Sequence, residues 1–253
     1  MKPWIKKFAL IAAAPIAIVT AAATAYAMTV QPVIIDLFPS GRQMSQVIQV
    51  QNTFQTQLPV ELRAQTATFE NGALKAAGGE TDDLLIFPPQ ALIEPGRTQS
   101  FRVQYVGDPE LAQSKHFYVT VAQLPVKLPE GQSAVQVLYN FQVIVSVGVP
   151  GAKPALQVTN ATISTTGDGQ PRVSLNLSNN SNTYGYLSAG SLKIVQRDAG
   201  GKEVYSRTFS PAEIQQEIGF GLVGAGQQRE MLTPIVLPQA GGTLEAEFTP
   251  RRG

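Results

Sequence analysis

The sequence predicts an all-β fold made of two consecutive β-sandwiches, and three observations support this prediction. Apolar and polar residues alternate with a period of two along many short segments, which is typical of half-buried strands. Long helical periodicity is nearly absent, and the 22 Gly and 18 Pro residues among 253 supply frequent turn signals. A Pro- and Gly-containing break at residues 150–154 separates two sets of such segments. Each set is close to the roughly 100 residues of an immunoglobulin-like sandwich.

The first 27 residues have the features of an export signal that is removed from the mature protein. A basic start is followed by an apolar run over residues 8–23 and by the small-residue cleavage motif Ala25-Tyr26-Ala27. Pro15 and the shortness of the run argue against a transmembrane anchor. We therefore expect a signal peptide at 1–27 and no membrane span in the mature protein.

The first set of strands falls within residues 28–150, which we predict to form the N-terminal immunoglobulin-like domain. Alternation predicts strands at residues 47–51, 62–67, 101–105 and 117–121. Turn signals separate them at residues 39–41, 70–72, 94–96 and 129–131. Strands recurring at this spacing favour an antiparallel sandwich.

The second set follows a predicted hinge at Pro150 and Gly151, and we expect a C-terminal immunoglobulin-like domain over residues 151–253. Its predicted strands are residues 156–158, 172–177, 191–195, 232–236 and 244–248, with one short helix over residues 211–218. Both halves lack the Cys…Trp…Cys core of antibody domains, which argues against a domain of that type.

Composition excludes several classes of function. The chain has no cysteine, so it has no disulfide framework, no thiolate metal site and no thiol nucleophile. His116 is the only histidine, which excludes a multi-histidine metal centre within one chain, and it lies inside a predicted strand. No phosphate-binding, dinucleotide or nucleophile-elbow motif occurs. The formal net charge of +1 gives no basis for nucleic-acid binding. We therefore expect a protein that is not an enzyme and has no metal centre and no cofactor.

One apolar run, residues 134–149, is far longer than an ordinary strand. All its odd-numbered residues from 135 to 147 are apolar, so one face of an extended chain would be continuously apolar. One interpretation is a central strand that fills its own core. The other is that part of the run projects beyond the core for a second protein, because an exposed apolar strand is an aggregation hazard that proteins normally avoid. Periodicity alone leaves both interpretations open.

Several motifs in order resemble the periplasmic pilus-assembly chaperones of chaperone–usher systems. Phe87-Pro88-Pro89 is followed by Ile93-Glu94-Pro95-Gly96 and then by Ser100-Phe101-Arg102-Val103. The segment His116–Val121 with Leu124-Pro125 resembles the penultimate strand of the first domain in that family. The long apolar run and Pro150 then stand where the family has its donor strand and its interdomain proline.

The resemblance implies two immunoglobulin-like domains arranged as a boomerang, and a chaperone in the periplasm. It implies binding of pilus subunits that lack their final strand, by donor-strand complementation, and delivery of these subunits to an outer-membrane usher. The implied donor residues are Val135, Val137, Tyr139 and Phe141. It implies no nucleotide cofactor.

The sequence departs from the better-known members of this family, which hold the subunit's terminal carboxylate with an Arg and a Lys. The corresponding positions fall near residues 36–38 and on residues 144–145, where no basic residue stands. This departure resembles the archaic branch, which is associated with subunits of the spore-coat-U type. Arg102, Lys115 and His116 are the alternative candidates for a carboxylate anchor, because a carboxylate in a cleft needs a cationic partner. Structural roles for Arg102 and Lys115 stay open at this point.

A second hypothesis for function comes from a different class. The two sandwiches would form a secreted adhesin-like binding module that uses the polar loops at their ends to hold a carbohydrate or a protein. Such a module would be indifferent to changes in the apolar strand, whereas a strand-donating chaperone would not.

Overall fold

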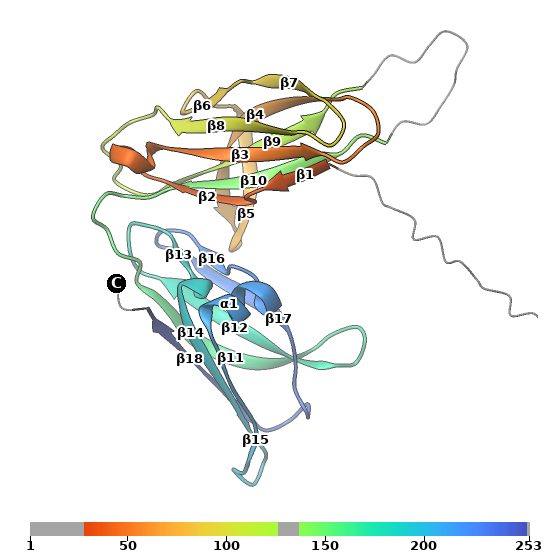
Figure 1. Cartoon of the computed structure of the whole chain (residues 1–253). Coiled ribbons are helices and arrows are strands. Elements are labelled where there is room, and N and C mark those ends of the chain that lie inside the picture. Colours follow the sequence, from red (N-terminus) through yellow and green to blue (C-terminus); the bar gives the residue numbers. More distant parts are fainter. Residues whose placement is uncertain (1–27, 126–136, 252–253) are drawn as a thin grey trace, which may run out of the picture.

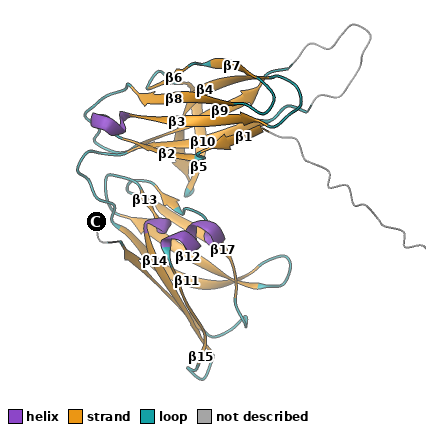
Figure 2. Ribbon diagram, viewed as in Figure 1, coloured by secondary structure: helices purple, strands orange, loops and turns teal. Residues whose placement is uncertain are grey.

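The computed structural model describes residues 28–125 and 137–251, and these residues are mostly strand. Figures 1 and 2 show two β-sandwiches joined by one connection and set at an angle to each other. The predicted all-β fold class is confirmed. The predicted signal peptide lies outside the described residues. Within the described ranges, no helix is long and apolar enough to cross a membrane.

The first sandwich consists of two facing sheets. The strand order of one sheet is β1-β3-β8-β6, with β1 (Met28–Gln31), β3 (Ser45–Asn52), β8 (Thr98–Tyr105) and β6 (Leu84–Phe87). The order of the other is β2-β10-β9-β4-β5, with β2 (Ile34–Leu37), β10 (Asn140–Val147), β9 (Lys115–Gln123), β4 (Leu58–Glu70) and β5 (Ala73–Glu80). Two further elements are β7 (Gln90–Ile93), which pairs with β4, and the 3-10 turn η1 (Gly41–Met44).

The core of the first sandwich follows from the alternation in the sequence. In β8, Phe101, Val103 and Tyr105 are completely buried, whereas Arg102 between them faces solvent. Phe117 from β9 in the opposite sheet packs against this row, with its ring centroid 6.4 Å from that of Tyr105. Each large apolar side chain removed from water contributes roughly 1.5–3 kcal/mol, so apolar packing alone can stabilise a sandwich that has no disulfide.

The second sandwich has its own apolar core between two three-stranded sheets. One sheet is β11-β12-β17, with β11 (Leu156–Thr165), β12 (Pro171–Asn179) and β17 (Gln228–Val236). The other is β15-β14-β18, with β15 (Glu203–Phe209), β14 (Gly190–Arg197) and β18 (Thr243–Pro250). A short pair of strands lies at the end of the second sandwich that faces the first: β13 (Gly185–Tyr186) with β16 (Leu222–Val223). The 3-10 turn η2 (Leu187–Ala189) follows β13.

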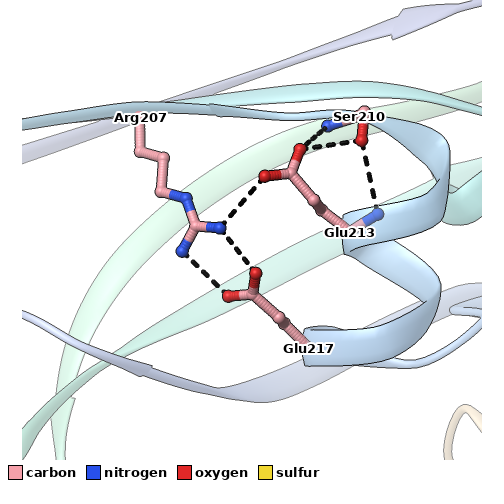
Figure 3. A network of polar contacts seen from close by, with 4 residues as sticks. All are labelled: Arg207, Ser210, Glu213 and Glu217. Carbon is pink, nitrogen blue, oxygen red and sulfur yellow. Dashed lines mark hydrogen bonds and ion pairs between the residues drawn. The ribbon is translucent and has the colours of Figure 1, made fainter.

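The predicted short helix is present as α1 (Pro211–Glu213), which continues as the π-helical turn η3 (Ile214–Ile218). Ser210 caps its beginning in a reciprocal capping box with Glu213, and these hydrogen bonds hold the pKa of Glu213 at about 2. Arg207 on β15 reaches across to both Glu213 and Glu217, as Figure 3 shows, with 2.8 Å between its Nη1 and Oε2 of Glu217. The helix is therefore fixed to the sheet by one guanidinium group.

The prediction of one strand over residues 134–149 is wrong in its extent. The strand β10 covers Asn140–Val147, residues 137–139 are not in a strand, and residues 134–136 lie outside the described residues. The physical reason is that the neighbouring strand ends here. β9 stops at Gln123, one residue beyond the partner of Asn140, so residues 137–138 have no described strand beside them with which to pair. Pro150 and Gly151 form a turn after β10, and the use of that turn as a hinge between independently folding units stays a prediction.

Candidate functional site

The odd-numbered side chains of β10 and of the residues before it pass gradually from the core into solvent. Those nearest the end of the strand are completely buried: Val143, Val145 and Val147. Phe141 is half-buried and packs against the edge of the core. Tyr139 is 37% exposed and Val137 is 65% exposed. The core face of β10 therefore continues into an apolar surface outside the core. The second interpretation of the long run requires such a surface, and its use by a second protein stays a prediction.

The backbone of the first part of β10 has an open side. The carbonyl of Tyr139 accepts a hydrogen bond from β9 at 3.0 Å, whereas the N–H of Ile144 donates to the carbonyl of Val33 before β2, also at 3.0 Å. Backbone groups alternate in direction along a strand, so those of Asn140 and Gln142 point to the side of β2. However, β2 pairs only with residues 144–147. Among the described residues, no strand pairs with residues 140–143 on that side.

Three of the four predicted donor residues lie within the described part of the chain. Val137, Tyr139 and Phe141 follow one another with the same parity beside this open edge. The ring of Tyr139 contacts that of Phe54 at 6.0 Å between centroids, which supports the segment outside the core. Val135 lies outside the described residues. The role of these side chains in binding a subunit stays a prediction.

The candidate anchors do not form one cluster. Arg102 lies on the outer face of the first sheet, exposed and without an ion pair to any described residue. Lys115 pairs with Asp83 at 2.8 Å, and this hydrogen bond raises the pKa of Lys115. His116 is next to Lys115 but is buried, and burial lowers its pKa to about 4. The use of these three residues as anchors stays a prediction, with only Lys115 and His116 brought together.

His116 belongs to a row of aromatic rings that joins the two sandwiches. Its ring lies edge-on to Phe69 at 5.0 Å and to Tyr184 of the second sandwich at 5.6 Å between centroids. The row continues from Tyr184 to Tyr186 at 5.4 Å and from Tyr186 to Phe220 at 6.2 Å. Sequence reasoning missed this row, because its members come from four separate segments.

A polar link accompanies the aromatic row. The hydroxyl of Tyr186 donates to Oδ1 of Asp36 on β2 at 2.7 Å. Burial and then the negative charge of Asp36 raise the pKa of both Tyr184 and Tyr186, so both hydroxyls stay protonated. Nδ1 of His116 is hydrogen-bonded to Oγ of Ser146 at 2.9 Å. The interface thus combines aromatic packing with hydrogen bonds from both sandwiches.

Two clefts lie at the ends of this row. The larger, of about 900 Å³, lies between the β1–β2 region and the residues around Tyr186 and Phe220. The smaller, of about 460 Å³, is lined by Lys115 and His116 from the first sandwich and by Ala225 and Gln227 from the second. Within the described ranges, no group of three or more His, Asp or Glu side chains could hold a metal ion.

Comparison with known families identifies the kind of domain that the first sandwich forms. Residues 29–146 match the family described as pili and flagellar-assembly chaperone, PapD N-terminal domain. Residues 29–146 are a pilus-assembly chaperone domain. The chaperone function expected from the sequence is confirmed by this match, and the alternative of a loop-binding adhesin module is not favoured. The family is a family of chaperones and is not known for enzymes.

Solved structures of chaperones resemble the whole fold. The YadV chaperone superimposes with a TM-score of 0.50 at 16% identity, over 87% of this chain and 91% of that chain. The SafB chaperone in complex with the SafA pilin of Salmonella enterica gives 0.49 at 13%, over 91% and 99%. The CsuC–CsuE complex of chaperone and tip subunit from archaic Csu pili of Acinetobacter baumannii gives 0.48 at 12%, over 81% and 89%. No curated protein sequence matches the chain significantly. At 16% identity the likeness to the YadV chaperone shows the fold alone.

Proposed function

We propose that this pilus-assembly chaperone binds subunits in the periplasm by donating residues 135–141 as a missing strand, and delivers them to an outer-membrane usher. The single observation that carries the proposal is the open apolar edge before and along the first half of β10. There, Val137 and Tyr139 leave the core with the parity of Val143, and no described strand covers the backbone beside them.

The energetics of this edge favour an added strand. Val137 and Tyr139 lose most of their remaining contact with water if they enter an apolar groove, and burial of a large apolar side chain contributes roughly 1.5–3 kcal/mol. The outward backbone groups of Asn140 and Gln142 offer hydrogen bonds that fix the register of an added strand without depending on its sequence. A chaperone of this kind can therefore accept several related subunits.

Delivery to an usher needs a second surface that the bound subunit leaves free. The outer face of the sheet β1-β3-β8-β6 supports this part of the proposal. There, Arg102 on β8 lies directly beside Phe87 on β6, and Phe87 is 71% exposed. An exposed aromatic ring beside an unpaired arginine is the composition that protein interfaces favour.

The periplasmic location and the archaic branch belong to the same proposal. The signal-like residues 1–27 support export, and a chain with no cysteine folds independently of the oxidising conditions in that compartment. The absence of a basic residue on β2, where Asp36 stands instead, supports the archaic branch. For the carboxylate anchor we propose Lys115, because it is partly exposed and lines a cleft between the two sandwiches, where a subunit carboxylate would compete with Asp83 for its ammonium group.

The test is capture of a subunit in a periplasm. The mature chain is co-expressed with a pilin-like subunit encoded beside its gene, and the complex is recovered through a tag on the chaperone. Val137→Asp with Tyr139→Asp should abolish recovery of the subunit, because two charges would enter an apolar groove. Leu138→Asp is the matched control, since Leu138 is 44% exposed and has the opposite parity. Equal recovery with the double variant and with wild type would refute strand donation.

A second pair of variants tests the anchor. Lys115→Ala should reduce recovery of the subunit, because it removes the cation from the smaller cleft. Arg102→Ala is the comparison on the outer face of the first sandwich. Recovery reduced by Arg102→Ala and unaffected by Lys115→Ala would contradict Lys115 as the anchor.

A further inference from the structure

The larger of the two clefts contains a carboxylate, that of Asp36, with which no described cation forms an ion pair. Its lining comes from residues 30–34, Asp36 and β3 on one side and from Tyr186, Ser188, Gln215 and Phe220 on the other. Asp36 is the only charged side chain among the lining residues, and no Lys, Arg or His is among them. Asp36 is half-buried and forms no ion pair with a described residue. The hydroxyl of Tyr186 donates a hydrogen bond to this carboxylate but brings no positive charge, so a cationic ligand would add a charge-assisted interaction.

The walls of the cleft suit the stem of a long cationic side chain. Tyr186 and Phe220 lie edge-to-face, with 6.2 Å between ring centroids, and both rings line the cleft. Aromatic rings attract cations through their negative faces, and an ammonium or guanidinium group between a carboxylate and such rings is held by both. On the opposite wall, Val33 is 50% exposed and Val47 is 42% exposed. Apolar walls of this kind cover the methylene stem of Lys or Arg.

The cleft is continuous with the open edge of β10. The hydrogen bond from the N–H of Ile144 to the carbonyl of Val33 closes that edge, and Val33 itself lines the cleft. A strand that added beside residues 137–143 would therefore run toward the cleft at the end where β2 begins. Figure 1 shows β2 and β10 together on the side of the first sandwich that faces the second.

We propose that this cleft binds a lysine or arginine side chain of the captured subunit, with Asp36 as the residue that selects positive charge. The proposal rests on the proposed function for the identity of the partner. A carboxylate in the same place would face Asp36 without a compensating cation, and a neutral apolar group would leave that carboxylate unpaired. The selection is therefore for charge as well as for shape.

Small probes test the cleft without a subunit. The mature chain is titrated with n-butylammonium, with n-butanol and with butyrate, while backbone amide resonances are followed by NMR. Butylammonium should cause saturable shifts at Ile34–Leu37 and at Tyr186, and butanol and butyrate should bind at least about tenfold more weakly. Equal binding of butylammonium and butanol, or the absence of shifts at these residues, would overturn the proposal.

Two variants separate the contributions of charge and of the aromatic wall. Asp36→Asn keeps an oxygen that accepts from Tyr186 but removes the charge, and it should weaken butylammonium binding by about tenfold without changing that of butanol. Phe220→Leu keeps the charge and removes one ring, and it should also weaken butylammonium more than butanol. If Asp36→Asn binds butylammonium as tightly as wild type does, Asp36 does not select the ligand.

The subunit assay distinguishes failure of this inference from failure of the proposed function. If Asp36→Asn captures subunit as wild type does, while Val137→Asp with Tyr139→Asp does not, strand donation stands and the cleft does not hold a subunit cation. If Asp36→Asn weakens both capture and butylammonium binding, the cleft is part of the subunit site. If the double variant on the donor segment captures subunit normally, the proposed function fails whatever the probes do.

Discussion

The lone histidine predicts a specific loss of stability in acid. His116 is buried between the two sandwiches, and burial lowers its pKa from 6.5 to about 4. Above pH 6.5 the residue is neutral in both the folded and the unfolded state, so it contributes no pH dependence there. Below pH 6.5 the unfolded chain takes up a proton that the folded protein does not bind, and this stabilises the unfolded state. The free energy of unfolding therefore falls between pH 6.5 and pH 4 and then levels off.

The size of the loss follows from the two pKa values. At pH 4.5 the difference in proton binding amounts to about 2.5 kcal/mol, from 1.36 kcal/mol per pH unit over the interval in which only the unfolded chain is protonated. With a urea m-value of about 2 kcal/mol/M, this moves the midpoint of unfolding by about 1 M.

The assay compares urea unfolding of wild type and of His116→Gln at pH 7.5 and at pH 4.5, followed by circular dichroism. Glutamine does not titrate and retains a group that can bond Ser146. Carboxylates contribute equally in both proteins, so the difference between their pH-dependent losses isolates the histidine. If His116→Gln loses as much stability between the two pH values as wild type does, then burial of a neutral imidazole is not the cause.

Two further predictions concern packing and local electrostatics. Phe209→Ala should lower the free energy of unfolding by about 3–5 kcal/mol, because Phe209 is completely buried in the second core, whereas Phe87→Ala, at a side chain 71% exposed, should change it by no more than about 0.5 kcal/mol. Thermal or urea unfolding of both variants measures this contrast, and similar effects would contradict the assigned core. Ser210→Ala should raise the pKa of Glu213 above its value of about 2, because it removes the hydrogen bond from the hydroxyl and keeps the one from the backbone N–H. Carboxyl resonances in an NMR titration report the shift, and an unchanged pKa would refute it.

Much of the fold could be predicted because single strands carry their own burial pattern. The run Phe101-Arg102-Val103-Gln104-Tyr105 alternates in the sequence, and its odd members are completely buried in the structure. The short helix was also predictable, because a serine followed by a proline and then by a glutamate is a local capping signal. Neither inference needs information from elsewhere in the chain.

The contact between the sandwiches could not be predicted, because it depends on which outward face the second sandwich covers. In β9 the side chains of Phe117 and Val119 face the core, so alternation places His116 on the outer face of that sheet. Its neighbours on that face, Ala67 and Ser146, are also buried. Alternation alone predicts exposure for all three. The cover supplied by Tyr184 and Tyr186 comes from the other half of the chain.

The prediction of one strand over residues 134–149 failed for a related reason. The sequence of residues 134–149 satisfies a strand pattern over its full length, but a strand also needs a paired backbone. Within the described residues, β9 provides ladder pairing as far as Asn140 and one further backbone hydrogen bond to Tyr139. The β-propensity of a residue describes how well its side chain fits a pleated surface, and it carries no information about where the neighbouring strand ends.

The same property makes the unpaired segment suitable for donation. Because side chains on a strand alternate with a period of two, the face on which Val137 and Tyr139 project is set by the buried Val143, Val145 and Val147 further along the chain. An added subunit strand that pairs with residues 137–143 is held in register by a segment anchored in the chaperone's own core. The core therefore acts as the fixed end of the binding edge, and the apolar face that the chaperone offers to a subunit is a continuation of the face that stabilises the chaperone itself.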